Sequence, residues 1–197
     1  MRGSLAAALL GLALPAALGA AEPSWRVAHG EVRVHCPLTV GGSFDAKTTA
    51  LSGELTLVSS APVSLGGELA VELGSLDTGI GLRNEHMRDK YLEVGRGVGF
   101  DHAVVSGVSL GNVDPATFQG RTAFTGTLLL HGTKRPVSGQ ATIRRDGRSI
   151  HVEASFPVTV TDHGIPKPQY LGVGVRNEVN VMVSFVAEPS AGTGSAP

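Results

Sequence analysis

Alternation of apolar and polar residues with a period of two recurs along this chain and restricts its fold more than any other feature. It is clearest in residues 68–73, 151–160 and 179–185, where every second residue is Leu, Val, Ala or Phe. Because successive side chains leave a β-strand on opposite sides, each stretch has one apolar face and one more polar face. The alternation therefore predicts strands of a sheet whose apolar face is covered.

Residues that favour turns separate these stretches from further strand candidates. The candidates are residues 26–35, 39–47, 51–58, 98–110, 118–130 and 136–144. Asp146-Gly147, placed between two apolar runs, is a strong hairpin signal. We predict an all-β fold of about eight or nine strands, in a meander that hides its edges by closing into a barrel or folding into a sandwich.

One segment departs from the strand pattern. Residues 82–92 are rich in charge, lack Gly and Pro, and space Leu82, Met87 and Tyr91 at loosely helical intervals. The preceding residues 75–79 are of the types that favour turns and helix starts. We predict one short helix over residues 80–92.

The N-terminus has the order of a secretory signal. A basic head precedes a run of Leu and Ala, and small residues allow cleavage after Gly19 or Ala21. A membrane anchor is the alternative, but it needs about 20 apolar residues, and this run is shorter and is interrupted by Pro15. We predict a signal peptide over residues 1–21, a single domain over 22–187 and a disordered tail over 188–197. The protein is then periplasmic or secreted and has no stable membrane anchor.

Charge and cysteine content narrow the range of partners. The formal net charge is −1, which gives no long-range field for nucleic acid, so we expect no nucleic-acid partner. Cys36 is the single cysteine and cannot form a disulfide within one chain. A buried small hydrophobe is the favoured interpretation of Cys36, with a reactive thiol or a bridge between two chains as the alternatives. The sequence leaves open whether two copies of the chain form a homodimer.

The sequence offers little support for catalysis or metal binding. The seven histidines are scattered without a metal-ligand spacing, although the fold could still gather two or three of them. Residues 107–111 lie in a strand-like run rather than at a strand-to-helix turn, and no phosphate-binding glycine loop is present. We therefore predict no catalytic residue, no cofactor and no metal.

Four stretches together resemble the YceI-like family of exported, lipocalin-like proteins that bind polyisoprenoids and related long-chain lipids. They are residues 75–94, residues 130–137, residues 162–166 with 175–185, and residues 41–44 with 51–55. The likeness spans about residues 25–186. Three features depart from the family pattern: Asn84 stands where Asp is usual, residues 95–100 lack an aromatic-Pro step, and Arg135 is an additional basic residue.

The resemblance implies a lipocalin-like antiparallel β-barrel of about eight strands whose lumen holds a long apolar ligand. The inward faces would supply the lumen residues Leu55, Leu57, Leu69, Val71, Leu73, Phe124, Leu128, Phe156, Val158, Val181 and Phe185. A polar head group would lie at the barrel mouth against Arg83, His86, Met87, Arg88 and Tyr91. An ordinary solvated helix and a lumen filled by its own side chains are the competing interpretations.

We therefore expect a protein that binds, transports or sequesters a polyisoprenoid, an isoprenoid quinone or a fatty-acid-like lipid, and that is not an enzyme. The alternative is a ligand-free structural or stress-response β-domain that acts through a protein partner. An exposed apolar patch away from the barrel mouth would favour that alternative. An enzyme acting on lipids is a third and weaker hypothesis.

Overall fold

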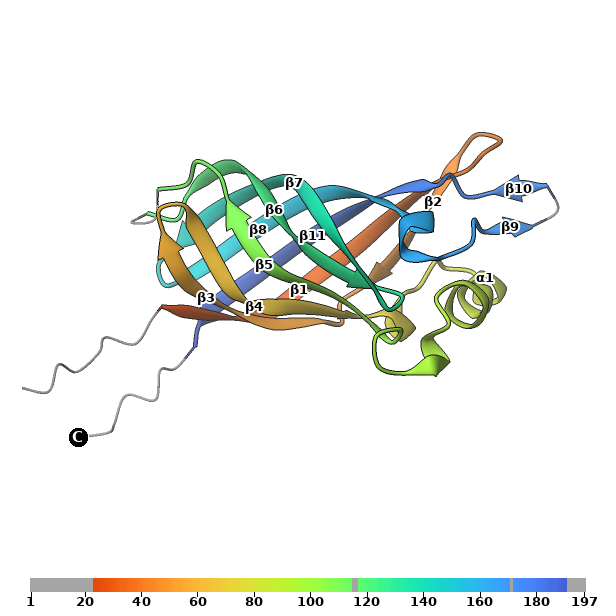
Figure 1. The fold of residues 1–197 in the computed structure, drawn as a ribbon, viewed down its shortest axis with the longest axis horizontal. Coiled ribbons are helices and arrows are strands. Elements are labelled where there is room, and N and C mark those ends of the chain that lie inside the picture. The colour runs from red at the N-terminus through yellow and green to blue at the C-terminus, as the bar shows by residue number, and fades with distance from the viewer. Residues whose placement is uncertain (1–22, 115–116, 171, 191–197) are drawn as a thin grey trace, which may run out of the picture.

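Eight antiparallel strands form a closed ring in the computed structural model, which describes residues 23–114, 117–170 and 172–190 (Figure 1). In ring order they are β11 (Glu178–Pro189), β8 (Ser149–Thr159), β7 (Thr133–Asp146), β6 (Gly120–Leu130), β5 (His102–Leu110), β4 (Val63–Glu72), β3 (Leu51–Ser60) and β1 (Ser24–Pro37). Pairing of β1 with β11, from Trp25 opposite Pro189 to His35 opposite Asn180, closes the ring. The predicted all-β, lipocalin-like barrel of about eight strands is confirmed.

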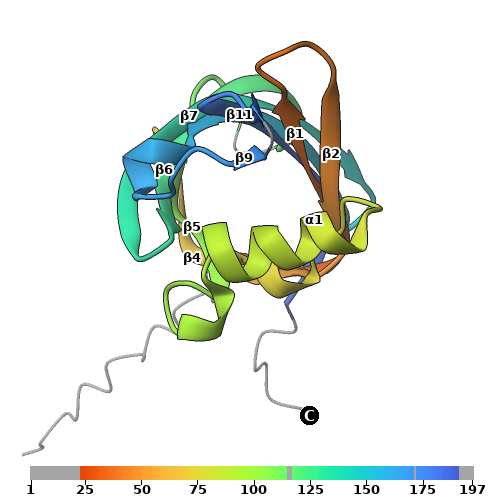
Figure 2. The same cartoon turned by 90° about the vertical axis from the view of Figure 1, so that its right-hand side faces the viewer.

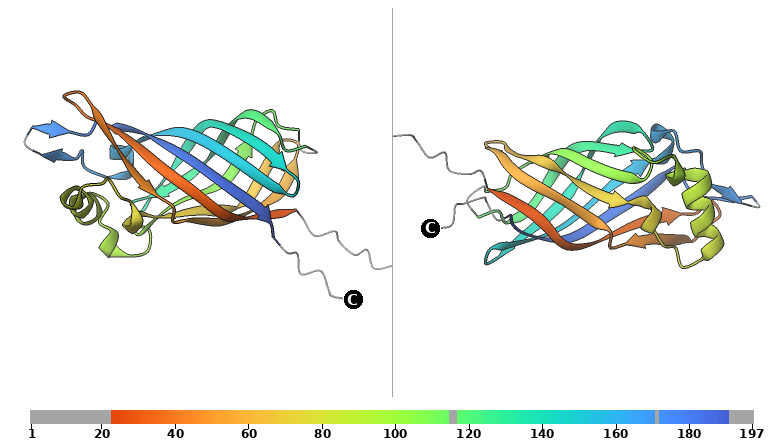
Figure 3. Two further views of the ribbon diagram at one scale, coloured as in Figure 1. Left: turned by 180° about the vertical axis from the view of Figure 1, so that it is seen from behind. Right: turned by 90° about the horizontal axis from the view of Figure 1, so that it is seen from below.

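Strand β1 is shared between two neighbours along one of its edges. Its first residues, 24–26, pair with β3, whereas residues 32–37 pair with β2 (Ser43–Thr48). The β1–β2 hairpin consequently projects past the ring at one end, as Figure 3 shows from two further sides. The opposite end of the barrel is where β1 starts and β11 finishes, and there Ser190 N donates to Ser24 O at 2.9 Å.

The predicted helix is present and lies across the end from which the β1–β2 hairpin projects (Figure 2). It consists of α1 (Gly81–Glu85), which continues into the wider turns of η2 (His86–Tyr91). Asn84 fixes its start, because its amide Nδ2 donates to Asp77 Oδ1 at 2.6 Å and its Oδ1 accepts from Thr78 N at 2.8 Å. The family usually has Asp at position 84, and a carboxylate there could not donate a hydrogen bond to Asp77. The change to Asn84 therefore alters the contact with Asp77 and not a contact with Arg83.

Several boundaries differ from the sequence expectations because turns and bulges interrupt the alternation. Residues 39–42 and 98–100 are turns and not strand, and β6 begins after Phe118, whose φ is +50°. Leu73 lies in η1 (Leu73–Ser75) and Val160 in η4 (Val160–His163), both short 3-10 turns. A third such turn, η3 (Val94–Arg96), follows the helix. The two-residue strands β9 (Gln169–Tyr170) and β10 (Val173–Gly174) form a small hairpin that the sequence did not reveal.

The chain ends require one correction. Strand β11 runs to Pro189, so residues 188 and 189 belong to the barrel and not to the predicted tail. Residues 191–197 and the predicted signal peptide over residues 1–21 lie outside the described residues. Within the described ranges, no helix has the length and apolar character needed to cross a membrane.

Candidate ligand-binding cavity

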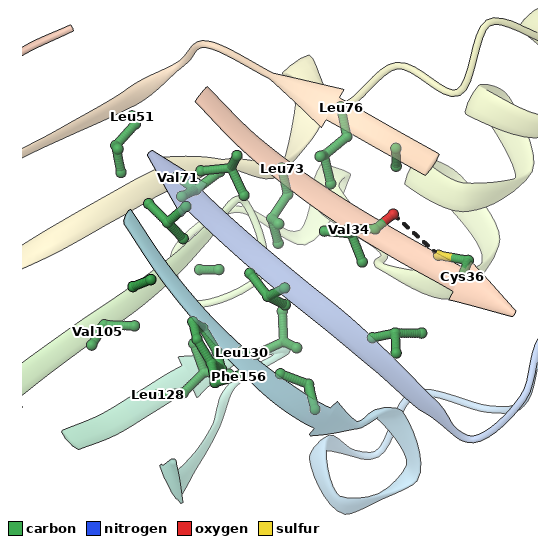
Figure 4. Close-up of a pocket in the computed structure, with 18 of the residues that line it drawn as sticks. Val34, Cys36, Leu51, Val71, Leu73, Leu76, Val105, Leu128, Leu130 and Phe156 are labelled. Atoms are coloured by element: carbon green, nitrogen blue, oxygen red, sulfur yellow. Dashed lines mark hydrogen bonds between the residues drawn. The ribbon is translucent and has the colours of Figure 1, made fainter. Parts of the chain in front are cut away.

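A cavity of about 640 Å³ occupies the inside of the barrel. Side chains from all eight ring strands line it, together with residues of β2, of the helix and of the segment that carries β9 and β10. Figure 4 shows part of this wall, with Val34, Leu51, Val71, Val105 and Leu128 among the lining side chains. The volume falls in the range of about 300–1,000 Å³ that is usual for ligand pockets.

The wall is apolar and is not filled by its own side chains. Leu55, Leu69, Val71 and Val181 belong to the barrel interior and are nevertheless only half-buried, because they border the cavity rather than other atoms. No Asp or Glu side chain of the described residues lines the cavity. The sequence left open whether the lumen is filled by its own side chains, and the structure shows that it is open.

Ten of the eleven lumen residues expected from the sequence line this cavity. They are Leu55, Leu69, Val71, Leu73, Phe124, Leu128, Phe156, Val158, Val181 and Phe185. Leu57 is a correction: it packs against the main core cluster without lining the cavity, at the place where the β3–β4 register shifts between Leu57 and Ser59. The contact of these ten residues with a ligand remains a prediction.

Aromatic side chains close the cavity at the end of the barrel where β1 starts and β11 finishes. The loop after β5 folds inward there and buries Val113 and Phe118, the latter only 5% exposed. Phe118 packs against Trp25 with ring centroids 5.4 Å apart. Away from this end, Phe124 and Phe156 of the cavity wall meet edge-on with ring centroids 5.8 Å apart. Trp25 and Phe118 both line the cavity and form its floor.

The helix and the β9–β10 hairpin border the cavity at the other end. Arg83, His86, Met87 and Tyr91 line it there, as the sequence led us to expect of a barrel mouth. The Arg83 guanidinium lies 4.1 Å from the centre of the Phe44 ring. No carboxylate of the described residues forms an ion pair with Arg83. The mouth therefore presents a partly buried cation beside an apolar space.

Arg88 was expected to contact a head group at the barrel mouth, but it does not line the cavity, so it is removed from the predicted head-group residues. Its Nη2 donates to the Leu76 carbonyl at 2.8 Å, and its Nε is buried without a hydrogen-bond partner among the described residues. Arg88 therefore ties the helix to the turn that precedes it. Arg135, the additional basic residue, donates to the Asp162 carbonyl at 2.9 Å and does not line the cavity either.

Comparison with known proteins decides the family. A sequence model of the YceI-like domain matches residues 24–187. The chain belongs to the YceI-like family. No curated protein matches the sequence.

Solved structures support the fold of this YceI-like barrel at low sequence identity. A polyisoprenoid binding domain from Saccharophagus degradans matches with a TM-score of 0.62 at 17% identity, over 84% of this chain and 98% of that one. BcnA of Burkholderia cenocepacia matches with a TM-score of 0.61 at 14% identity, over 80% and 95%. The YCEI protein of Campylobacter jejuni matches with a TM-score of 0.52 at 13% identity, over 72% and 82%.

Cys36 of this YceI-like chain lies in the cavity wall near the mouth. It is 8% exposed, and its Sγ donates to the Val34 carbonyl at 3.7 Å (Figure 4). Burial, followed by the negative charge of Asp45, raises the pKa of the thiol to about 12, against a smaller lowering by Arg83. The thiol is therefore neutral at physiological pH and packs as a small hydrophobe.

The predicted lumen set contained no residue of β1, β5 or β7, although all three strands of the YceI-like barrel line the cavity, β7 through Ala141 and Ile143. On β1 the signal was present, because Val32, Val34 and Cys36 alternate with polar residues. On β5 it was hidden: Val105 and Val108 both line the cavity although they are three positions apart, a spacing that puts two residues of a regular strand on opposite faces. The β5–β6 register shifts between Ser106 and Ser109, at Gly107 with φ of +60°, and such a bulge reverses the phase of the alternation.

The remaining chemistry of the described residues is sparse. They contain no group of three or more His, Cys, Asp or Glu side chains placed to hold a metal ion. Residues 107–111 have the Gly-x-Ser-x-Gly spacing of a nucleophile elbow, but Ser109 lies inside β5 and its hydroxyl donates to the Val63 carbonyl at 3.4 Å. Ser109 is therefore an ordinary strand residue and not a nucleophile at a sharp turn.

Proposed function

We propose that this protein binds one long-chain apolar molecule inside the barrel and carries or sequesters it in an exported compartment. The observation that supports the proposal most is the continuous apolar cavity of about 640 Å³, walled by every strand of the ring. The structural neighbour from Saccharophagus degradans is a polyisoprenoid binding domain, which points to polyisoprenoids as one ligand class. Isoprenoid quinones and fatty-acid-like lipids are the other ligand classes that we propose for this apolar wall.

The size of the cavity sets the scale of the bound chain. A methylene group is about the size of a water molecule, which takes about 30 Å³. A cavity of about 640 Å³ therefore has room for about twenty such groups. Each methylene that leaves water for this wall contributes about 0.8 kcal/mol, before the entropy cost of association. A chain of roughly twenty carbons would be enclosed, and a longer one would extend through the mouth.

The polar end of the ligand would lie at Arg83. This guanidinium is held over Phe44 at 4.1 Å and has no carboxylate partner among the described residues, so it can donate to an oxygen of a phosphate, a carboxylate or a quinone. His86 lines the same part of the cavity. The ligand would then enter tail first, with its head group at the helix.

A matched pair of substitutions tests whether the lumen is the binding site. Ala154 faces the cavity from β8 and is half-buried, whereas Ala123 on β6 is exposed on the outside. Ala154→Phe fills part of the cavity and should remove most of the lipid that is extracted with organic solvent from the purified protein and measured by mass spectrometry. Ala123→Phe should retain about one lipid per chain. Equal lipid content in the two variants, or none in the unmodified protein, would contradict the proposal.

A second substitution tests the head-group position. Arg83→Gln should weaken the binding of a fluorescent fatty acid by about tenfold, because a hydrogen bond between charged groups contributes about 1.5–3 kcal/mol. Lys90→Gln is the control, since Lys90 is exposed on the same helix and does not line the cavity. The same loss in both variants would place the head group elsewhere.

A further inference from the structure

Exposed apolar side chains are concentrated at the open end of the barrel. Of the described residues, six large hydrophobic side chains are exposed, and only Val58, in the last part of β3 before the turn to β4, is at the closed end. The other five are Val40 at 72% exposure, Ile80 at 49%, Leu82 at 54%, Val98 at 96% and Val173 at 41%. Single exposed hydrophobic residues are common on protein surfaces, but a one-sided distribution needs a reason.

Four of these residues form what we call the rim: Val40, Ile80, Leu82 and Val173. The last three also line the cavity, so the apolar surface runs without interruption from the lumen to the outside. Val40 lies in the β1–β2 turn, which is held against β10 by the bond from Thr39 N to Gly174 O at 2.8 Å. Figure 2 shows this turn and the helix on opposite sides of the opening.

The segments that carry the rim are basic, in contrast to the chain as a whole. Besides Arg88, which is held by the Leu76 carbonyl, residues 38–42, 80–91 and 164–176 contain four Lys and Arg residues against Glu85 and Asp89, while the formal net charge of the chain is −1. Basic residues beside exposed apolar ones suit a bilayer that contains anionic lipids, because the charges attract the head groups and the apolar side chains enter the interface.

We infer that the rim docks the open end of the barrel on the surface of a lipid bilayer, so that a long-chain ligand passes between bilayer and cavity along a continuous apolar path. The inference rests on the proposed function, since only a carrier of apolar ligands needs such a path. Each methylene exposed to water on the way would oppose transfer by about 0.8 kcal/mol. Docking removes that exposure by bringing the cavity wall to the membrane.

Identical substitutions at the two ends of the barrel test the docking. Val40 and Val58 are both exposed valines in hairpin regions, and neither lines the cavity. We expect the purified protein to float with vesicles of phosphatidylcholine and phosphatidylglycerol. Val40→Trp should raise its partition into the vesicles by about tenfold, since Trp favours the membrane interface. Val58→Trp should leave the partition unchanged, and Val40→Ser should lower it several-fold.

Binding of a fluorescent fatty acid in solution, without vesicles, separates this inference from the proposed function. All three variants should bind the fatty acid as the unmodified protein does. Docking is refuted if the protein binds the fatty acid but does not float, or if Val40→Trp and Val58→Trp change the partition equally. A dimer in sedimentation experiments that Val40→Ser dissociates would assign the rim to a second copy and overturn the inference. Flotation without fatty-acid binding, by a protein from which organic solvent also extracts no lipid, would support docking and refute the proposed function.

Discussion

The two ends of the barrel are formed by the same strands but are closed in different ways. At one end Trp25 and Phe118 pack against each other and are held by the loop after β5. At the other end a helix and a small hairpin lie across the ring (Figure 2), and Arg83 lines the cavity there among apolar residues. The comparison indicates that the closed end supplies stability and the open end supplies access.

The contact across the open end is correspondingly slight. The Tyr91 hydroxyl donates to the Gln169 carbonyl at 3.2 Å and accepts from the Gln169 amide at 3.1 Å, which joins the helix to the β9–β10 hairpin. Both residues are in contact with solvent, so this connection can open without disturbing the strands. A mouth of this kind lets a ligand exchange while the barrel stays folded.

The largest expected effect is on stability at the closed end. Phe118→Ala should lower the free energy of unfolding by about 3–5 kcal/mol, because it removes a buried aromatic ring from the cavity floor. Leu82→Ala at the open end should change it by no more than about 0.5 kcal/mol, since Leu82 is 54% exposed. Urea unfolding measures both. Similar losses at the two ends would remove the distinction drawn between them.

The second effect concerns whether the open end admits water to the cavity wall. With the pKa of Cys36 raised from 9.0 to about 12, the folded protein contains about a thousandfold less thiolate than the unfolded chain at pH 7. A charged aromatic disulfide reagent should therefore react about a thousandfold more slowly with the native protein than with protein in urea. Rates within tenfold of each other would show that the wall near Cys36 is hydrated.

The third effect is on ligand exchange. Tyr91→Phe removes both hydrogen bonds to Gln169, each of which contributes about 1 kcal/mol. The dissociation rate of a fluorescent fatty acid should rise by about tenfold, and the association rate should rise with it, so that the affinity changes little. Stopped-flow displacement measures the dissociation rate. An unchanged rate would show that the mouth does not limit exchange.

The smallest effect is on acid stability near the open end. The hydrogen bond from Arg96 at 2.7 Å, and then the charges of Arg96 and His131, lower the pKa of Glu93 from 4.5. A carboxyl with a lowered pKa stabilises the fold above its ordinary pKa, and this contribution is lost as the pH falls through the folded value. Glu93→Gln should therefore lose slightly less stability between pH 6 and pH 3 than the unmodified protein. Identical losses in thermal unfolding would contradict this assignment.

Much of the fold could be predicted from the alternation alone. A period of two assigns each strand residue to one of two faces, and this was sufficient for the all-β fold and for ten of the eleven expected lining residues, whereas the choice of a barrel over a sandwich came from the family resemblance. The pattern failed where the backbone changes phase, as at Gly107 in β5, and where the register shifts beside Leu57. Bulges depend on hydrogen bonds to neighbouring strands, which a single strand does not specify.

The sequence by itself determined the apolar and polar faces, the position of the helix and the family likeness, because these depend on neighbouring residues in the chain. Only the tertiary structure decided that the lumen is open, that Phe118 meets Trp25, and that Arg83 lines the cavity while Arg88 does not. These features depend on distances between segments far apart in the chain. Whether facing side chains fill the space between them is therefore settled only once the ring has closed.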